Sequence, residues 1–321
     1  GEQNRRLATC DDNDNSNNNV NYRVGATSAI CIVDAACLAK AYVSQGIRNS
    51  CGLGSGPGPV AQTSFPSSWQ DFPNIVSWNA PAFDSTASSF QPMMSYGDRK
   101  NDELDEDSST PVLGRILPIV DTVPWVQRLC QTPGVTDIQL RIKDIDEPTA
   151  IADRVQLCQD FCAEHNVRLW INDHWKAAIQ SGCFGVHLGQ EDLTKCIRSG
   201  GINQLRSDGI ALGISTHSYS ELAVALGVHP SYISMGPVYA TSSKNVKFDP
   251  QGLTKVKNWR ELIPPTIPFV TIGGINDVVA AEANRQSGSN CIAVIGAITK
   301  SENIASSVDF LNKAMTKPSK L

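Results

Sequence analysis

Residues 168–189, RLWINDHWKAAIQSGCFGVHLG, contain the unit that decides the fold: an apolar run, an amphipathic segment and a second apolar run. Eight such runs follow Pro111, and each precedes a segment with helical character: ILPIV (116–120), DIQLRI (137–142), RLWIN (168–172), GVHLG (185–189), ALGIS (211–215), YISMG (232–236), PFVTIG (268–273) and CIAVIG (291–296). After the second run, one helix face carries Ile151, Val155, Cys158 and Cys162. Short strands that alternate with helices are typical of an α/β fold. Eight units predict a closed (β/α)8 TIM barrel over residues 111–321.

The segment before the barrel divides by composition. Residues 11–21, DDNDNSNNNVN, offer almost no apolar side chain to bury, and we expect residues 1–24 to be disordered. Residues 25–76 hold the apolar helical stretch CIVDAACLAKAYVSQGIR and the Gly/Pro-rich GLGSGPGPV, which together are too short for a robust domain. Residues 77–110 include NDELDEDSST, whose carboxylates repel one another, and are predicted to be a linker. The barrel is therefore expected to follow a partial, largely disordered N-terminal segment.

Composition and charge exclude several classes of protein. The chain has 321 residues, of which 41% are hydrophobic and 18% charged, as in soluble globular proteins. A formal net charge of −5 argues against a dominant nucleic-acid or anionic-membrane surface, and no apolar run reaches the length of a membrane span. The ten cysteines form no CxxC pair and follow no signal-peptide pattern, which predicts reduced thiols inside the cell.

Polar side chains cluster where the second strand ends. Gln139, Arg141 and Lys143 alternate along the strand, so they share one face and project into one site. Active sites of such barrels lie at these carboxyl ends. Two inward cations are costly unless an anion meets them, so the pattern favours an anion site. The alternative, a pair of solvated charges on an edge strand, is weaker because a closed barrel has no edge strand.

Carboxylates follow the third and fourth strands. Asn172 and Asp173 end the third strand, and Asp192 follows the fourth. Carboxylates from neighbouring strand ends can share Mg²⁺, which prefers oxygen ligands and often binds substrate phosphates as well. Taken alone, Asp173 is better interpreted as a helix N-cap and Asp192 as a first-turn residue. Their position beside Arg141 and Lys143 favours the metal.

The later strands end in residues suited to phosphate. A Ser215–His217 nucleophile and base is rejected because no acid orients the imidazole, which leaves a polar binding shelf. Hydroxyls and a cation follow the sixth strand, and glycines that admit close backbone contacts follow the last two. These residues are Thr241, Ser242, Ser243, Lys244, Gly273, Gly274, Ile295 and Gly296. The remaining histidines, His187 among them, are interpreted as structural or surface residues. One cationic pocket for a diphosphate and one backbone-lined pocket for a monophosphate are therefore expected.

The motifs QLRIKD, WINDHW, FGVHLGQEDL, LGISTHS, MGPVYATSSK and TIGGI resemble those of thiamin phosphate synthase, in order and spacing, across residues 111–321. The resemblance implies coupling of 4-amino-5-hydroxymethyl-2-methylpyrimidine diphosphate with a thiazole monophosphate to give thiamin phosphate and diphosphate. In that family the carbon–oxygen bond to diphosphate breaks first, and the thiazole nitrogen attacks the resulting pyrimidine cation.

The resemblance also implies roles for the candidate residues. The pyrimidine diphosphate would be bound by Gln139, Leu140, Arg141, Ile142, Lys143, Asn172, Ser215 and Lys244, with Arg141, Lys143, Ser215 and Lys244 in catalytic roles. Mg²⁺ would be held by Asp173 and Asp192, and the thiazole phosphate by Thr241, Ser242, Ser243, Gly274, Ile295 and Gly296. The family commonly has Thr at Ser243 and Ser at Gly296, so weaker thiazole phosphate binding is expected.

The front segment AKAYVSQGIRNSCGLGSGPGPV resembles the C-terminal end of hydroxymethylpyrimidine phosphate kinase, which is fused to the synthase in some organisms. GATSAI (25–30) stands where that kinase has GTGC and lacks its catalytic Cys, so no kinase activity is expected. A longer kinase–synthase fusion, a homo-oligomer, and cytoplasm or plastid as the compartment stay open. The alternatives to a synthase are a thiazole tautomerase-like barrel enzyme and an inactive ligand-binding paralogue, both disfavoured by the retained Arg141, Lys143, Asp173 and Lys244.

Overall fold

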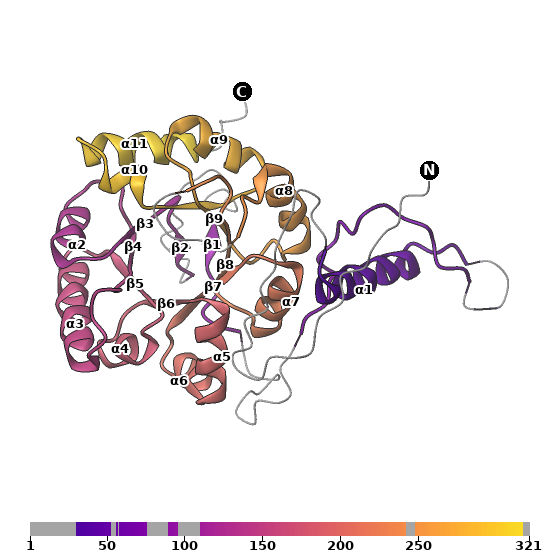
Figure 1. Cartoon of the computed structure of the whole chain (residues 1–321), viewed down its shortest axis with the longest axis horizontal. Coiled ribbons are helices and arrows are strands. Elements are labelled where there is room, and N and C mark those ends of the chain that lie inside the picture. The colour runs from indigo at the N-terminus through magenta and orange to yellow at the C-terminus, as the bar shows by residue number, and fades with distance from the viewer. Residues whose placement is uncertain are drawn as a thin grey trace, which may run out of the picture.

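The computed structural model describes residues 30–52, 56, 58–75, 89–95, 110–241 and 248–316. Its centre is a closed barrel of parallel strands in the order β10-β3-β4-β5-β6-β7-β8-β9 (Figure 1). These strands are β3 (Ile116–Val120), β4 (Asp137–Leu140), β5 (Arg168–Asn172), β6 (Gly185–Leu188), β7 (Ala211–Thr216), β8 (Tyr232–Met235), β9 (Phe269–Ile272) and β10 (Cys291–Val294). The predicted (β/α)8 barrel is confirmed, and the predicted strand ends differ from the observed ones by at most two residues.

Helices surround the strands as an outer ring (Figure 1). They are α2 (Val123–Cys130), α3 (Pro148–Glu164), α4 (Trp175–Gln180), α5 (Gln190–Arg198), α6 (Gly201–Ser207), α7 (Tyr219–Val228), α8 (Gly252–Leu262), α9 (Val278–Gln286), α10 (Gly296–Thr299) and α11 (Ile304–Ala314). The predicted apolar face of α3 is confirmed, because Val155, Cys158 and Cys162 are fully buried and Ile151 nearly so. None of the helices in the described ranges is long and apolar enough to cross a bilayer.

Strand alternation separates two layers of core. Side chains that point inward, such as Trp170, Tyr232 and Val270, fill the barrel interior, whereas outward ones such as Leu140 pack against the helices. Gly213 makes room for the interior, since a Cβ on it would lie 2.1 Å from Cζ of Tyr232. The large rings of Trp170 and Tyr232 fill the barrel interior, and a cavity lies at the carboxyl ends of the strands.

The opposite end of the barrel is closed by a short parallel pair, β1 (Met94–Ser95) and β2 (Val112–Leu113). Met93 and Leu113 belong to the interior apolar cluster. Beside them the fully buried Asp137 carboxylate accepts hydrogen bonds from Arg168 at 2.6 and 2.8 Å and from Trp170 Nε1 at 3.0 Å. A buried charge that is paired in this way fixes the floor of the barrel without leaving an unsatisfied group.

The N-terminal segment lies outside the helix ring. Its helix α1 (Ile32–Arg48) packs beside α7 (Figure 1), and Arg48 pairs with Asp71 at 2.6 Å. The predicted disorder of 1–24, and the predicted linker of 77–110 apart from 89–95 and 110, fall outside the described residues. Within 89–95, Phe90 and Met93 are buried against the barrel. The nine cysteines of the described residues are all free thiols.

Candidate functional site

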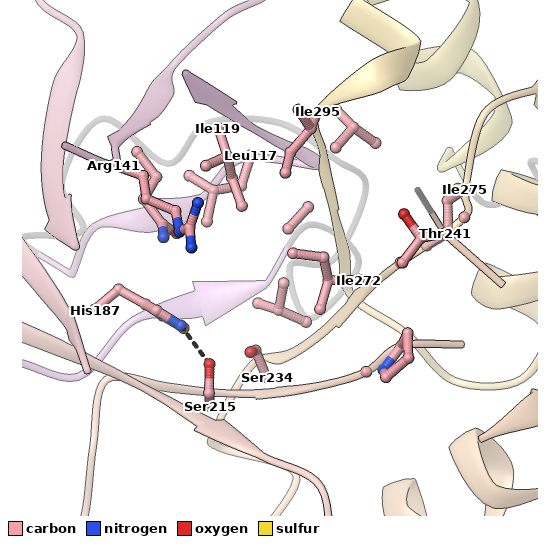
Figure 2. A pocket seen from close by; sticks show the side chains of 18 of the residues that line it. Leu117, Ile119, Arg141, His187, Ser215, Ser234, Thr241, Ile272, Ile275 and Ile295 are labelled. Carbon is pink, nitrogen blue, oxygen red and sulfur yellow. Dashed lines mark hydrogen bonds between the residues drawn. The ribbon is translucent and has the colours of Figure 1, made fainter. Parts of the chain in front are cut away.

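A cavity opens at the carboxyl ends of the strands, where the sequence places the candidate residues. Figure 2 shows Arg141 and His187 on one side and Thr241 and Ile275 on the other. Its lining includes the predicted Gln139, Arg141, Asn172, Ser215, Thr241, Gly274, Ile295 and Gly296. Ser242, Ser243 and Lys244 lie outside the described residues.

The cationic side of the cavity is built on β4 and β5. Arg141 follows β4 and takes part in none of the ion pairs formed among the described residues. Gln139 Nε2 donates a hydrogen bond of 2.9 Å to Asn172 Oδ1, and both side chains are buried. Leu140 and Ile142 point away from the cavity into the core beneath the helices, so only their backbone can serve the site.

Lys143 and Asp173 form an ion pair at the edge of this site, with 2.5 Å between Nζ and Oδ2. Burial favours the neutral form of Asp173, but the hydrogen bond and charge of Lys143 outweigh it, so the pKa of that carboxyl is lowered. Asp173 has a φ of 66°, a left-handed conformation that is uncommon for Asp. The N-cap of α4 is His174, without a side-chain capping bond, so the interpretation of Asp173 as a cap is wrong.

Asp192 lies in the first turn of α5, as the alternative interpretation predicted, and its carboxylate lies 2.9 Å from Lys195 Nζ. The pKa of Lys195 is raised by the hydrogen bond and charge of Asp192, with smaller contributions from Glu191 and Asp173. Asp173 and Asp192 are thus each paired with a different lysine, Lys143 and Lys195.

This donor set fits Mg²⁺. The described residues contain no cluster of three or more His, Cys, Asp or Glu side chains that would form a complete metal site. Mg²⁺ is usually held by one or two carboxylates, with water and substrate phosphates completing its six oxygen ligands. Asp173 directly follows the cavity-lining Asn172 and supplies one such carboxylate, whereas Asp192 lies in the first turn of α5 and, like Asp173, is not among the residues that line the cavity.

The opposite side of the cavity is mostly backbone. Gly273 and Gly274 follow β9 with φ values of 101° and 69°. A Cβ on Gly274 would lie 2.6 Å from Ala240 O, so only glycine fits there without displacing the loop after β8. With Thr241 on one flank and the turn at Ile295–Gly296 on the other, this side offers amides and one hydroxyl to an anion.

The sequence interpretation missed a hydrogen-bonded row across β6, β7 and β8. Tyr232 Oη lies 2.8 Å from His187 Nδ1, and His187 Nε2 lies 2.6 Å from Ser215 Oγ (Figure 2). Burial raises the pKa of Tyr232 well above its ordinary value, so the phenol stays neutral. His187 is therefore a site residue and not only a structural one. Its partner at Nδ1 is a neutral phenol and not a carboxylate, so the row is not a hydrolase triad.

Comparisons with known proteins point to one family. A family model described as thiamine monophosphate synthase matches residues 112–298. The thiamine-phosphate synthase of Photorhabdus laumondii is 40% identical over 193 residues, which cover 59% of this chain and 83% of that protein. The thiamine-phosphate synthase of Rhizobium etli is 40% identical over 182 residues, which cover 57% of this chain and 85% of that protein.

Among solved structures, the thiamine phosphate pyrophosphorylase from Pyrococcus furiosus superposes with a TM-score of 0.53 and 23% identity, covering 63% of this chain and 95% of that one. At this identity the likeness supports the fold alone. The family model spans more than half of the chain and includes the strands that carry the cavity. The chain therefore belongs to the thiamine monophosphate synthase family.

Proposed function

We propose that this chain condenses 4-amino-5-hydroxymethyl-2-methylpyrimidine diphosphate with 4-methyl-5-(2-phosphoethyl)thiazole, giving thiamin phosphate and diphosphate. The observation that carries the proposal is Arg141, a guanidinium that lines the cavity and pairs with no carboxylate of the described residues. Arg141 is partly buried, and a partly buried cation without a counter-charge is costly, so the site favours an anionic ligand. The resemblance to thiamin phosphate synthase implies that this ligand is a diphosphate, and the family model that matches residues 112–298 supports that resemblance.

The diphosphate subsite is assigned to the side formed by β4, β5 and β7. The planar guanidinium of Arg141 can donate two parallel hydrogen bonds to phosphoryl oxygens. Gln139 and Asn172 hold each other in place beside it and leave amide groups for the pyrimidine. Ser215, fixed by His187 at 2.6 Å, adds a hydroxyl. Lys143 and, by resemblance, Lys244 add further positive charge, and the backbone at Leu140 and Ile142 is assigned to the same subsite.

We infer that Asp173 and Asp192 would hold Mg²⁺, which when bound supplies positive charge to the diphosphate. The ammonium of Lys143, at 2.5 Å from Asp173, lowers the pKa of that carboxyl and so favours its ionised form, which a metal ligand requires. Arg141 and Lys143 therefore bring positive charge to the departing diphosphate, and the two carboxylates would bring the metal ion.

The reaction needs no general base. The thiazole nitrogen attacks through its own lone pair and carries no proton to remove, so catalysis depends on stabilising the departing diphosphate and protecting the pyrimidine cation from water. Leu117, Ile119 and Ile272 form an apolar wall between the two sides of the cavity (Figure 2). That wall limits the water that would otherwise capture the cation in place of the thiazole.

The thiazole phosphate subsite is assigned to the backbone-lined side, with Thr241, Gly274, Ile295 and Gly296, and by resemblance Ser242 and Ser243. Amide donors bind phosphate without a side-chain charge. Because Gly296 carries no hydroxyl, the KM for the thiazole phosphate is expected to fall when Gly296 is replaced by Ser.

The experiment is formation of thiamin phosphate by the purified chain from both substrates with Mg²⁺. Product is expected only with both substrates, it should stop when EDTA is added, and it should return with excess Mg²⁺. A folded protein that forms no product would contradict the proposal and favour a tautomerase-like enzyme or an inactive paralogue.

For the N-terminal segment we propose the divisions 1–24, 25–76 and 77–110 before the barrel at 111–321, with 25–76 a remnant of hydroxymethylpyrimidine phosphate kinase. No kinase activity is expected, and ATP-dependent phosphorylation of the pyrimidine monophosphate by the purified chain would contradict this. The free thiols favour a reducing compartment, the cytoplasm or a plastid. A homo-oligomer and a longer kinase–synthase fusion stay predictions, which light scattering and the full-length transcript would test.

A further inference from the structure

The loop after β7 carries an imidazole into the cavity. His217 lines the cavity, its ring stacks on Phe248 at 4.1 Å between centroids, and its Nδ1 lies 3.0 Å from Glu221 Oε2. The expectation that no acid orients this imidazole is therefore wrong, although Ser215 is hydrogen-bonded to His187 and not to His217. No described residue hydrogen-bonds the other ring nitrogen, Nε2. Since Nδ1 and the ring face are both occupied, Nε2 is the atom of His217 that is left for a substrate.

The helix that supports this imidazole is held by the N-terminal segment. Asp34 Oδ1 on α1 accepts a hydrogen bond of 2.7 Å from the backbone N–H of Ser220, 186 residues later. Ser220 is the second residue of α7, where an amide lacks a partner within its own helix and a carboxylate is favoured by the helix dipole. Asp34 thereby fixes the turn of α7 that holds Glu221, which in turn holds His217.

The ammonium group of Lys255 on α8 contacts the same loop. Lys255 Nζ donates to the carbonyl oxygen of His217 at 3.1 Å, and it lies 5.4 Å from the centre of the Tyr219 ring. Burial lowers the pKa of Lys255, and the carboxylates of Asp34 and Glu221 partly offset this. The ammonium group therefore lies in the field of the carboxylate on α1 and of the one that holds His217.

We propose that Asp34 and Lys255 are positioning residues for the reaction, and that His217 is a substrate-contacting residue that they hold in the cavity. The N-terminal segment, which precedes the family match at residue 112, is then a working part of the active site. The kinetic part of this inference rests on the proposed function. The placement of the imidazole does not.

If Asp34 had only a structural role, its replacement would have a different effect. In that case its loss would act like the loss of any other contact of the segment, such as the ion pair of Arg48 with Asp71, which touches neither the β7 loop nor the cavity. Arg48→Ala is therefore the matched control for Asp34→Ala. Asp34→Asn keeps an oxygen that can accept from Ser220 and tests rescue by a conservative change.

The experiment compares the whole chain with these three variants in two measurements. The first is the ¹⁵N signal pattern of the His217 imidazole, assigned by its disappearance in His217→Gln. The second is kcat and KM for each substrate, with the thermal midpoint measured alongside. Asp34→Ala is expected to shift the His217 signal and to lower kcat/KM by about ten- to a hundred-fold, the scale of a displaced contact group. Asp34→Asn should recover most of the wild-type signal position and of kcat/KM, and Arg48→Ala should leave the His217 signal and kcat/KM unchanged.

An unmoved His217 signal in Asp34→Ala would overturn the inference, and so would equal losses of kcat/KM in Asp34→Ala and Arg48→Ala. If Asp34→Ala does not fold, Asp34→Ser, whose side chain is shorter and uncharged, decides through the same two measurements: a shifted His217 signal with a lower kcat/KM is expected, and an unshifted signal would overturn the inference. A wild-type protein without synthase activity would remove the proposed function, while the imidazole signal would still decide the positioning.

Discussion

Replacement of Arg141 by Met should separate activity from stability. Met has a similar reach and removes the charged fork, which lines the cavity and forms no ion pair with the described residues. A side chain whose charge serves only a ligand contributes little to folding. The free energy of unfolding of Arg141→Met should therefore stay within about 0.5 kcal/mol of wild type, as for substitutions that break no structural contact.

The expected loss of activity follows from the hydrogen bonds that the fork would make. Hydrogen bonds to charged groups contribute about 1.5–3 kcal/mol, which corresponds to a loss of about 12- to 150-fold in kcat/KM. Arg141→Lys restores the charge but not the paired geometry, so its kcat/KM should lie between that of Arg141→Met and that of wild type.

The assay is steady-state formation of thiamin phosphate with one substrate varied and the other saturating, together with urea unfolding. The loss should appear in kcat/KM for the pyrimidine diphosphate, while the KM for the thiazole phosphate changes little. If Arg141→Met keeps a kcat/KM within threefold of wild type, the reasoning that Arg141 serves the diphosphate is refuted. A fall of more than about 1 kcal/mol in its free energy of unfolding in urea would also refute it.

Three further predictions concern the metal, the hydrogen-bonded row and the thiols. Asp173→Asn keeps a side chain that tolerates the left-handed backbone, so the fold by circular dichroism should persist while the Mg²⁺ concentration for half-maximal activity rises roughly ten-fold or more; an unchanged Mg²⁺ requirement would remove Asp173 as a ligand. Tyr232→Phe removes the buried hydrogen bond to His187 and should lower the free energy of unfolding by about 1–3 kcal/mol in urea, whereas unchanged stability would show that the bond contributes nothing. Burial raises the pKa of Cys158 to about 12, so this thiol stays protonated in the folded state while the unfolded one ionises. Its contribution to stability is complete below the unfolded pKa and is lost as pH rises from there toward the folded pKa, at about 1.4 kcal/mol per pH unit. Urea unfolding at pH 8 and pH 10 should show a steeper decline in wild type than in Cys158→Ala, and equal declines would contradict it.

The barrel could be predicted because its strands are buried on both faces. Parallel strands of this kind are near-continuous apolar runs, so RLWIN and GVHLG were visible without any knowledge of their partners. The helix face of α3 was visible for a similar reason, since its period is local. The cationic residues were visible because Gln139 and Arg141 alternate along one strand and the carboxyl ends of all strands meet.

The row from His187 to Ser215 could not be predicted, because it depends on the register between strands. His187 lies level with Gly213, and Gly213 lies level with Tyr232. The missing side chain of Gly213 leaves the space that the Tyr232 ring fills. Nothing in GVHLG alone distinguishes a histidine that reaches a serine on the next strand from one that packs in a core.

The same reasoning explains why the contacts of Asp173 and of the N-terminal segment could not be predicted. An Asp before an amphipathic run is usually a helix cap, but here Lys143, 30 residues earlier, binds the carboxylate instead. The contact of Asp34 with Ser220 spans 186 residues and leaves no local pattern. Both contacts, Lys143 with Asp173 and Asp34 with Ser220, depend on tertiary packing and not on local sequence.

The most direct test of the central claim is the stoichiometry of the two products. Purified wild-type chain, supplied with both substrates and Mg²⁺, should form thiamin phosphate and diphosphate in equal amounts, with neither product when the thiazole phosphate or the metal is withheld. A correctly folded protein that forms neither product under these conditions would contradict the account.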